Sequence, residues 1–436
     1  GLINDQIAAW KAMEPLAEAI RAKPGSVGLM DRIRATVTRE QIEAMRDALK
    51  AKAKRAAALI KPGMYEANIL EYLQGERPSP TAQQRAFLDV LLDQWEGGPD
   101  SPRIAHIPER RNDDGDPRAA GVKVYVRRKI RKSRSGGLLA LDATGNPERL
   151  AEALGVDADD IDVINTRTRL PVLHTEIIGQ SFAKAKIKAP NPETKGGKNL
   201  ASKIALFIEG FGGSNAFVAT AKSIEQTLRD ALPPGMAIAH HGAMRGLNSH
   251  AESPAAFLVS REEPTPWAVE AAVATRHGKQ ARDLNLIGDR RDDQGQPFGY
   301  EPQARRIEGD GWPGVVKTVN ALPDPATDRE LTAIRDDALT QAAGRVRYVR
   351  QARMVFSMTG TGALGGNECA PDLPTGFRLD VEDAWTLAAF AAVARRNGGA
   401  LALSKKALTE ADRTLFSTPS RNLDALDDMA DRYPLG

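Results

Sequence analysis

Apolar residues recur along this chain with two different spacings, and the change of spacing divides the chain into three parts. In residues 1–95 they recur three or four positions apart, which is typical of amphipathic helices. The residues that carry this spacing include Leu16, Ile20, Ile33, Ile42, Met45 and Leu49. Proline–glycine pairs at 24–25 and 62–63 interrupt the pattern, so we expect a bundle of several helices with no visible chemistry.

A loop or boundary rich in glycine, proline and aspartate follows at residues 96–120. Valines then alternate with polar residues at 122–126, which predicts a strand with one polar face. The apolar run at 138–141 is typical of a buried parallel strand. A sharp turn at 142–147 leads into a predicted helix at 148–154.

Between residues 160 and 350, short apolar runs alternate with helical segments, which predicts a mostly parallel sheet with helices on both faces. The predicted strands are 162–164, 173–178, 216–220, 236–239 and 255–260. The predicted helices are 199–209, 224–232, 267–275 and 328–344, and residues 278–326 are expected to be irregular. Beyond residue 350 the pattern predicts a strand at 354–358, a glycine-rich turn, an apolar helix at 381–396 and a helical tail.

Composition narrows the class of protein. At about 150 residues per domain, 436 residues correspond to two or three domains. The net charge of +3, with 42% hydrophobic and 27% charged residues, argues against disorder, collagen and a disulfide scaffold. The single cysteine, Cys369, excludes an internal disulfide and a cysteine-based zinc site, and it fits a cytoplasmic location.

Two further absences bear on location and on the ends of the chain. No run of about 18 apolar residues exists, so we expect no membrane span. The chain has no signal-peptide pattern and no initiator methionine, which suggests a processed or excised piece.

Six histidines are scattered along the chain, and the spacing of His240, His241 and His250 invites a metal site. This group lacks carboxylate or cysteine partners at ligand spacing, so we expect neither zinc nor another bound metal. Serine nucleophile motifs of the G-x-S-x-G type are also absent.

Two clusters of basic residues are candidates for binding nucleic acid. The first contains Lys123, Arg127, Arg128, Lys129, Arg131, Lys132 and Arg134, and the second contains Lys184, Lys186, Lys188, Lys195 and Lys198. Such stripes neutralise phosphates without reading base sequence. The alternative for each is a solvated surface. Tyr125 alone is interleaved with the first cluster, which is little support for base stacking.

The most specific signal is the segment 341–350, QAAGRVRYVR, at the end of a predicted helix. A forked, always charged arginine such as Arg345 binds a phosphate through two contacts, and Gly344 allows close backbone approach. At a domain edge such an arginine can act on the transferring γ-phosphate of ATP. The alternative is a basic helix end that complements its own dipole.

Three other segments precede this one in a recognisable order. They are the turn at 142–144 after an apolar strand, the strand and helix start at 217–222, and the segment HHGAMRGLN at 240–248. With 341–350, they resemble the C-terminal half of a superfamily-two helicase. More narrowly, residues 120–350 resemble helicase parts of plasmid- and phage-borne replication proteins, often fused to a primase, in which LDATxNPE, HxGxxRGxN and QAxGRxR occur in this order.

The resemblance implies an α/β fold: a RecA-like parallel sheet with flanking helices, a helical N-terminal segment and a small, mostly helical C-terminal extension. It implies four stretches. Residues 1–120 form a helical segment and loop at the end of a first RecA-like lobe, and 121–159 hold the last strands of that lobe with the DAT turn. Residues 160–350 form the second RecA-like domain, and 351–436 form a C-terminal extension.

The resemblance also implies roles for residues. The catalytic group is Gln341, Arg345 and Arg347. Nucleotide binding or coupling falls to Asp142, Thr144, Asn146, Gly246, Asn248, Gly344 and Arg350. Nucleic acid is expected at Thr220, Lys222, Lys123, Arg127, Arg128, Lys129, Arg131 and Lys132.

The chain departs from the helicase pattern in three respects. No G-x-x-x-x-G-K-[ST] phosphate loop and no Asp-Glu pair occur. Tyr348 stands where a second arginine is common. We therefore expect ATP and Mg²⁺ only together with a preceding part that cradles the phosphates.

Three hypotheses follow. The first is the motor part of an ATP-dependent helicase or translocase in plasmid or phage DNA replication, acting on single-stranded or duplex DNA. The second is a non-catalytic nucleic-acid-binding module with a degenerate fold. The third is a scaffold for a primase or another replication protein, with residues 1–95 as the docking surface.

Overall fold

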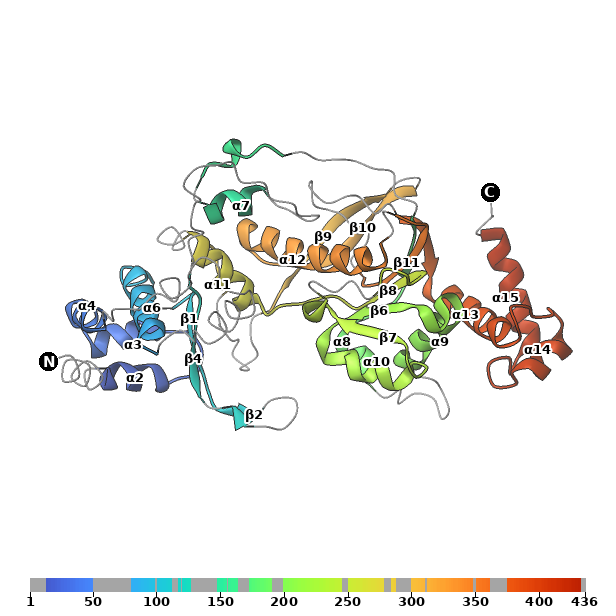
Figure 1. Ribbon diagram of the computed structural model, residues 1–436, viewed down its shortest axis with the longest axis horizontal. Coiled ribbons are helices and arrows are strands. Elements are labelled where there is room, and N and C mark those ends of the chain that lie inside the picture. The colour runs from blue at the N-terminus through green and yellow to red at the C-terminus, as the bar shows by residue number, and fades with distance from the viewer. Residues whose placement is uncertain are drawn as a thin grey trace, which may run out of the picture.

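The protein is elongated, with a helical N-terminal unit, a central sheet and a C-terminal helical pair following one another along the long axis (Figure 1). The computed structural model describes residues 13–49, 80–98, 100–111, 117–118, 120–126, 147–154, 156–163, 172–189, 199–244, 250–277, 284–287, 299–309, 312–347, 350–360 and 375–432.

The N-terminal unit is a helical bundle with a hydrophobic core of its own. Its helices are α2 (Glu14–Arg21), α3 (Leu29–Thr36), α4 (Arg39–Ala48) and α6 (Pro80–Asp93). The apolar spacing noted above forms this core, in which Leu16, Ile33 and Ile42 are almost fully buried. The side chain of Thr38 caps α4 by accepting a hydrogen bond from the backbone N–H of Gln41, whose own side chain accepts from Thr38. The predicted helices of this region are confirmed.

Short antiparallel strands accompany the bundle. They are β1 (Ile104–Ile107), β2 (Arg110–Arg111), β3 (Pro117–Arg118) and β4 (Gly121–Val124). The predicted strand at 122–126 is present as β4, but it pairs antiparallel with β1 in a two-stranded sheet. The described residues before 126 thus show a helical unit with antiparallel strands rather than the parallel strands of a first lobe. The predicted strand at 138–141 lies outside the described residues.

The centre of the protein is a six-stranded, fully parallel sheet. Its strands are β5 (Val172–Ile178), β6 (Phe217–Thr220), β7 (Ala237–His240), β8 (Ala255–Val259), β11 (Arg353–Met358) and β12 (Thr375–Asp380). They lie in the order β12-β5-β11-β8-β6-β7. The predicted RecA-like α/β class is therefore confirmed. The described part of the expected strand at 162–164 forms no strand.

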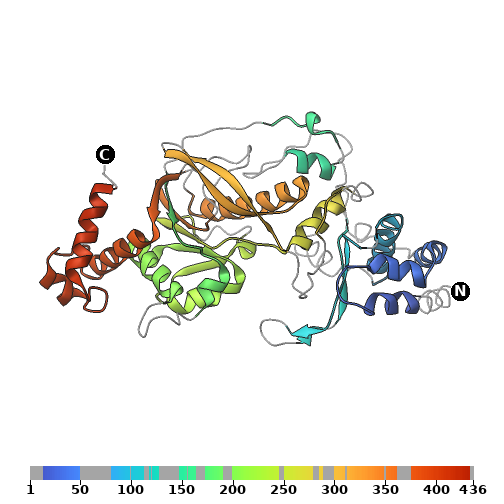
Figure 2. The same ribbon diagram turned by 180° about the vertical axis from the view of Figure 1, so that it is seen from behind.

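Helices cover both faces of the sheet (Figures 1 and 2). One face packs against α8 (Lys184–Lys188), α9 (Leu200–Gly212), α10 (Glu225–Ala231) and α13 (Val381–Arg396). The other packs against α12 (Pro325–Ala343), with α11 (Pro266–His277) beside it. Side chains alternate accordingly: in β8, Phe257 points to the α9 side and Leu258 to the α12 side. A Cβ at Gly212 would lie 2.5 Å from the ring of Phe257, so only glycine fits there.

Two features of the later chain differ from the expectation. Residues expected to be irregular contain a long antiparallel hairpin, β9 (Glu301–Gly309) and β10 (Trp312–Ala321). In addition, β11 lies between β5 and β8, so the sheet unit continues through β12 and α13 rather than ending at residue 350. The C-terminal extension is α14 (Lys405–Ala411) and α15 (Pro419–Arg432), which pack on α13 through Phe390 and Phe416. None of the described helices has the length and apolar character needed to cross a membrane.

Candidate functional site

The parallel sheet has two chemically different edges. All strand carboxyl ends meet at one edge, near Thr220, Ser260 and Thr359, and all amino ends meet at the other, near Arg353. The predicted site residues divide between these edges. Thr220 and Lys222 lie at the carboxyl edge, whereas Gln341, Gly344 and Arg345 end α12 beside the start of β11.

The carboxyl edge carries a pocket of about 450 Å³. Its walls come from separate segments: residues 180–184 after β5, Ser260, Arg261 and Glu263 after β8, Thr359 and Gly360 after β11, and Asn320 of β10. The strands β5 and β11 are neighbours in the sheet, but the chain leaves them in opposite directions. After β5 it goes to β6, beyond β11 and β8, and after β11 it goes to β12, beyond β5. Ligands of open α/β sheets bind at such a switch point, outside the carboxyl ends of the strands. The pocket therefore lies where a ligand site is expected.

A charged network forms one wall of this pocket. The carboxylate of Glu263 accepts hydrogen bonds from Arg261 at 2.7 Å and from Nε of Arg335 at 3.2 Å. The side chain of Arg335 is only 4% exposed, and it also donates to the carbonyl of Asn320 at 2.7 Å. The ring of Tyr300 lies 5.3 Å from that guanidinium, and its hydroxyl donates to the carbonyl of Pro264. Burial raises the pKa of Tyr300 well above its usual value. This network ties α12 to the loop that follows β8.

Lysines follow β5 and β6 at the carboxyl edge, alongside acidic residues such as Glu225 after β6 and Asp380 at the end of β12. In α8, which follows β5, only Ile187 is buried, and Lys184, Lys186 and Lys188 lie at least partly in solvent. Lys222 is exposed just after β6. Three of these four lysines are the described members of the second basic cluster. All four are candidates for contact with phosphates.

Two buried polar residues lie at the same edge. Thr220 is fully buried, and its hydroxyl has no hydrogen-bond partner among the described residues. It is not on the surface, so Lys222 is the member of that predicted pair that can reach a phosphate. Burial lowers the pKa of His241 to about 4, and the nearby positive charge of Lys184 acts in the same direction.

One strained backbone residue lies at this edge. Ser260, the residue after β8, has φ 62°, a left-handed conformation that is uncommon outside glycine. Its N–H donates to the carbonyl of Met358 at 2.9 Å, which holds the ends of β8 and β11 together. Strained residues of this kind cluster at functional sites.

The amino edge holds the arginine segment. Gly344–Val346 forms one turn of 3₁₀ helix after α12, anchored by the fully buried side chain of Val346. Arg347 follows with φ 54° and ψ 42°, a second strained non-glycine residue. Burial lowers the pKa of Arg345, and the charge of Arg347 lowers it further. Two arginines held this close favour an anion between or beside them. Arg350, three residues after Arg347, is exposed.

Arg353 connects this turn with the segment before β8. Its Nε donates to the carbonyl of Val346 at 3.0 Å, and another guanidinium nitrogen donates to the carbonyl of Ala251 at 3.2 Å. His250, the first described residue after 245–249, stacks on Phe217 at 4.3 Å, and burial and the charge of Arg345 lower its pKa. The arginine segment is thus bonded to the chain that follows Gly246 and Asn248. No spacing in the sequence pointed to Arg353.

Arg149 makes a second unforeseen connection. It lies in α7 (Pro147–Leu154), directly after the turn that was assigned a coupling role. Its Nε donates to Glu330 at 3.0 Å, and its guanidinium also bonds Asp337 at 3.1 Å, both in α12. Arg276 of α11 joins the same Glu330 at 2.6 Å. The helix that carries Gln341 is therefore held by α7 and by α11.

Several predicted residues fall outside the described part of the chain. They are Asp142, Thr144, Asn146, Gly246, Asn248, Arg127, Arg128, Lys129, Arg131 and Lys132. Lys123 is described; it is exposed in β4, remote in sequence from the sheet. Within the described ranges, no three histidine, cysteine, aspartate or glutamate side chains form a group that could hold a metal ion.

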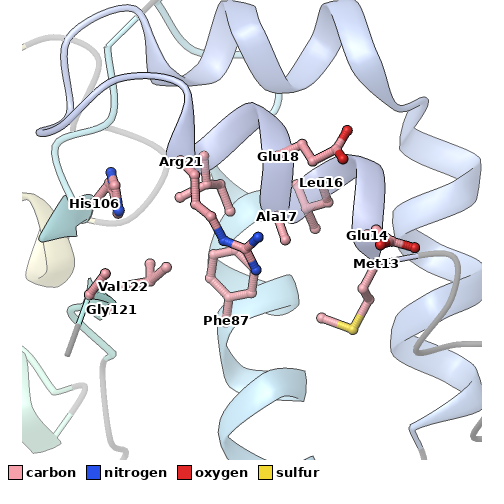
Figure 3. Close-up of a pocket in the computed structure, with 12 residues that line it drawn as sticks. Met13, Glu14, Leu16, Ala17, Glu18, Arg21, Phe87, His106, Gly121 and Val122 are labelled. Carbon is pink, nitrogen blue, oxygen red and sulfur yellow. The ribbon is translucent and has the colours of Figure 1, made fainter. Parts of the chain in front are cut away.

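A second cavity, of about 600 Å³, lies in the N-terminal unit (Figure 3). It is lined mainly by apolar residues of α2 and α6, such as Leu16 and Phe87, and by Val122 of β4. Glu18 and Arg21 of α2 also line it. It has neither the strained backbone nor the convergent cations of the carboxyl edge.

Comparisons of the chain with protein-family models, with curated proteins and with solved structures find no match.

Proposed function

We propose that this chain is the nucleic-acid-binding, arginine-contributing lobe of an ATP-dependent helicase or translocase. The observation that carries the proposal is that candidate nucleotide contacts and candidate nucleic-acid contacts lie at opposite edges of one RecA-like sheet. Arg345 and Arg347 lie in a strained turn after α12 at the amino edge, and a pocket lined by Lys184 and Arg261 lies at the carboxyl edge. A motor lobe needs such separate contacts with nucleotide and with nucleic acid.

At the amino edge, Arg345 and Arg347 fit the phosphate groups of ATP held by a neighbouring lobe. Bound ATP supplies the phosphoryl group whose transfer drives the motor. Arg345 would donate hydrogen bonds to the charge that develops on that group, and Gln341, one helical turn before it, would orient the nucleotide. The Mg²⁺ that accompanies ATP would be held with the nucleotide by that neighbouring lobe.

At the carboxyl edge, Lys184 and Lys222 would bind successive phosphates of a DNA strand. Arg353 and Arg149 would keep the arginine turn and α12 in place while the lobes open and close. Single-stranded or duplex DNA, a primase or other replication proteins of a plasmid or phage, and a cytoplasmic location belong to the same proposal.

A second candidate is a non-catalytic nucleic-acid-binding module. The observation that favours it is that the carboxyl-edge pocket is built from this chain alone, while the sequence contains no phosphate-cradling loop.

The test measures DNA binding and ATP hydrolysis separately. We expect the 436-residue chain alone to bind single-stranded DNA and to hydrolyse no ATP. Joined to a lobe with a phosphate loop from its own replication protein, it should hydrolyse ATP with stimulation by DNA, and Arg345→Ala should remove that hydrolysis while DNA affinity stays unchanged. Binding without hydrolysis in either form would favour the second candidate. Robust hydrolysis by the chain alone would contradict the proposal.

A further inference from the structure

An aromatic and cationic cluster joins the N-terminal unit to the sheet unit. Tyr125 follows β4 directly, and Trp267 lies in the first turn of α11. Their rings meet edge to face, with centroids 5.4 Å apart and planes at 77°. Nζ of Lys123 lies 5.0 Å from the centroid of Tyr125 and 5.3 Å from that of Trp267. Figures 1 and 2 both draw α11 between the β1–β4 pair and α12.

Both rings are held in place by their backbones. Arg103, whose side chain is 4% exposed, donates from two guanidinium nitrogens to the carbonyl of Tyr125 at 3.3 Å, and its own carbonyl accepts from the N–H of Tyr125 at 3.0 Å. Trp267 follows Pro266, which fixes the start of α11. Because the two rings are ordered in advance, a ligand that stacks on them loses little conformational entropy to order them.

The cluster exposes apolar ring surface and, beside it, the positive charge of Lys123. Tyr125 and Trp267 are each half-buried, and Lys123 is exposed. The indole nitrogen of Trp267 is buried without a hydrogen-bond partner among the described residues, so the accessible part of that side chain is its ring. Val122 and Val126, on either side of the cluster along the chain, are 42% and 45% exposed.

We propose that this cluster binds an unstacked base of single-stranded nucleic acid, with Lys123 on the adjoining phosphate. Base stacking on an aromatic ring is stronger than the contact of an exposed lysine with the same ring, so a base would displace the ammonium group to a phosphate. The inference rests on the nucleic-acid binding proposed above and adds that the substrate is a single strand with accessible bases.

The experiment compares an oligothymidylate with an abasic strand of the same length. Affinities of the full chain are measured by fluorescence anisotropy for the wild type, Trp267→Ala, Trp267→Phe and Lys123→Ala. Lys406→Ala, on the exposed surface of α14, is the matched control for loss of one charge.

We expect the wild type to prefer the thymidylate strand and Trp267→Ala to lose about 5- to 150-fold in affinity for that strand alone. Trp267→Phe should keep the preference, and Lys123→Ala should weaken both strands equally and more than Lys406→Ala does. Equal wild-type affinities for the two strands, or an equal loss for both in Trp267→Ala, would overturn the inference and leave the proposed function standing. Binding of neither strand would overturn both.

A fluorescence measurement covers the case in which Trp267→Ala does not fold. Thymidylate should quench the tryptophan fluorescence of the wild type, and the abasic strand should not. Trp267→Phe should remove that quenching. Quenching that persists in Trp267→Phe would place the stacked base elsewhere and contradict the inference.

Discussion

The two edges of the parallel sheet are built on different principles. The amino edge takes its chemistry from one continuous stretch, in which Arg345 and Arg347 follow α12 and a single buried residue, Val346, anchors them. The carboxyl edge assembles a pocket from four separate segments and stabilises it with an ion-pair network around Glu263. The contrast teaches that the candidate residues of the amino edge come from one local segment, whereas the residues that line the carboxyl-edge pocket also stabilise the fold.

The largest expected effect lies at the amino edge and concerns which arginine acts. When the chain is joined to a phosphate-cradling lobe, as the proposed function requires, Arg345→Ala should lower ATP turnover by roughly 10³- to 10⁵-fold, because an arginine of this kind acts where charge develops in the transition state. Arg345→Lys should not restore turnover, since an ammonium lacks the planar fork. Steady-state hydrolysis with saturating single-stranded DNA measures both.

Arg347→Ala and Arg350→Ala are the comparison for this prediction. If one of them loses turnover while Arg345→Ala keeps it, the assignment is shifted along the chain. If all three keep turnover, the segment is a structural helix end, and the proposed asymmetry of the two edges is wrong.

The second prediction concerns stability at the carboxyl edge. Glu263→Ala removes the carboxylate that compensates the buried guanidinium of Arg335, which is 4% exposed, and should lower the free energy of unfolding by about 3–5 kcal/mol. Urea denaturation measures the change. Glu262→Ala, one residue away, and Arg345→Ala should each change it by less than about 1 kcal/mol. Similar losses in all three variants would erase the contrast between the edges.

The third prediction is a pH dependence that belongs to His241. The pKa of His241 is about 4 in the folded state against 6.5 as a free group. The folded protein therefore takes up this proton at a lower pH than the unfolded chain does. The stabilising contribution of this histidine is complete above pH 6.5 and is lost as pH falls towards 4, by roughly 3 kcal/mol in total. Unfolding measured at both pH values should show this loss in the wild type and not in His241→Gln.

The histidine of the other edge is the control for that measurement. His250 is less buried than His241, and its pKa is lowered by burial and by the charge of Arg345. We expect His250→Gln to remove a smaller part of the acid destabilisation. A larger effect of His250→Gln than of His241→Gln would contradict the prediction that His241 contributes more to the acid destabilisation.

The smallest expected effect concerns the lysines of the carboxyl edge. Each phosphate contact with a single strand contributes about 0.7 to the slope of log affinity against log salt. Lys184→Ala and Lys222→Ala should therefore each lower that slope by about 0.7 in an anisotropy titration. Lys406→Ala, with its side chain 85% exposed on α14, should leave the slope unchanged, and so should Arg350→Ala at the opposite edge. An unchanged slope in both lysine variants would show that the strand binds elsewhere.

Sequence patterns predicted features that depend on neighbouring residues and missed sites that are assembled from distant segments. The apolar helix at 381–396 has the predicted bounds, because its start is set locally by Asp380, which accepts a hydrogen bond from the N–H of Glu382. The hairpin of β9 and β10 was missed because glycine and proline interrupt its alternation. Most of the wall of the carboxyl-edge pocket was missed because only strand pairing brings Lys184, Arg261 and Thr359 together. Trp267 was missed beside Tyr125 because only tertiary packing brings α11 next to the end of β4.

The position of β11 has a consequence for how the protein is made. A ribosome completes β5, β6, β7 and β8 before it reaches Arg353, yet β11 is the strand that joins β5 to β8. Until then β8, β6 and β7 can associate only with one another, and β5 has neither of its neighbours. The nascent chain must carry both edges of β5 and one edge of β8 unpaired through this interval, and such edges recruit other chains. Closure of the sheet is thus a late event, and a fragment that stops at residue 350 would hold that aggregation-prone state permanently.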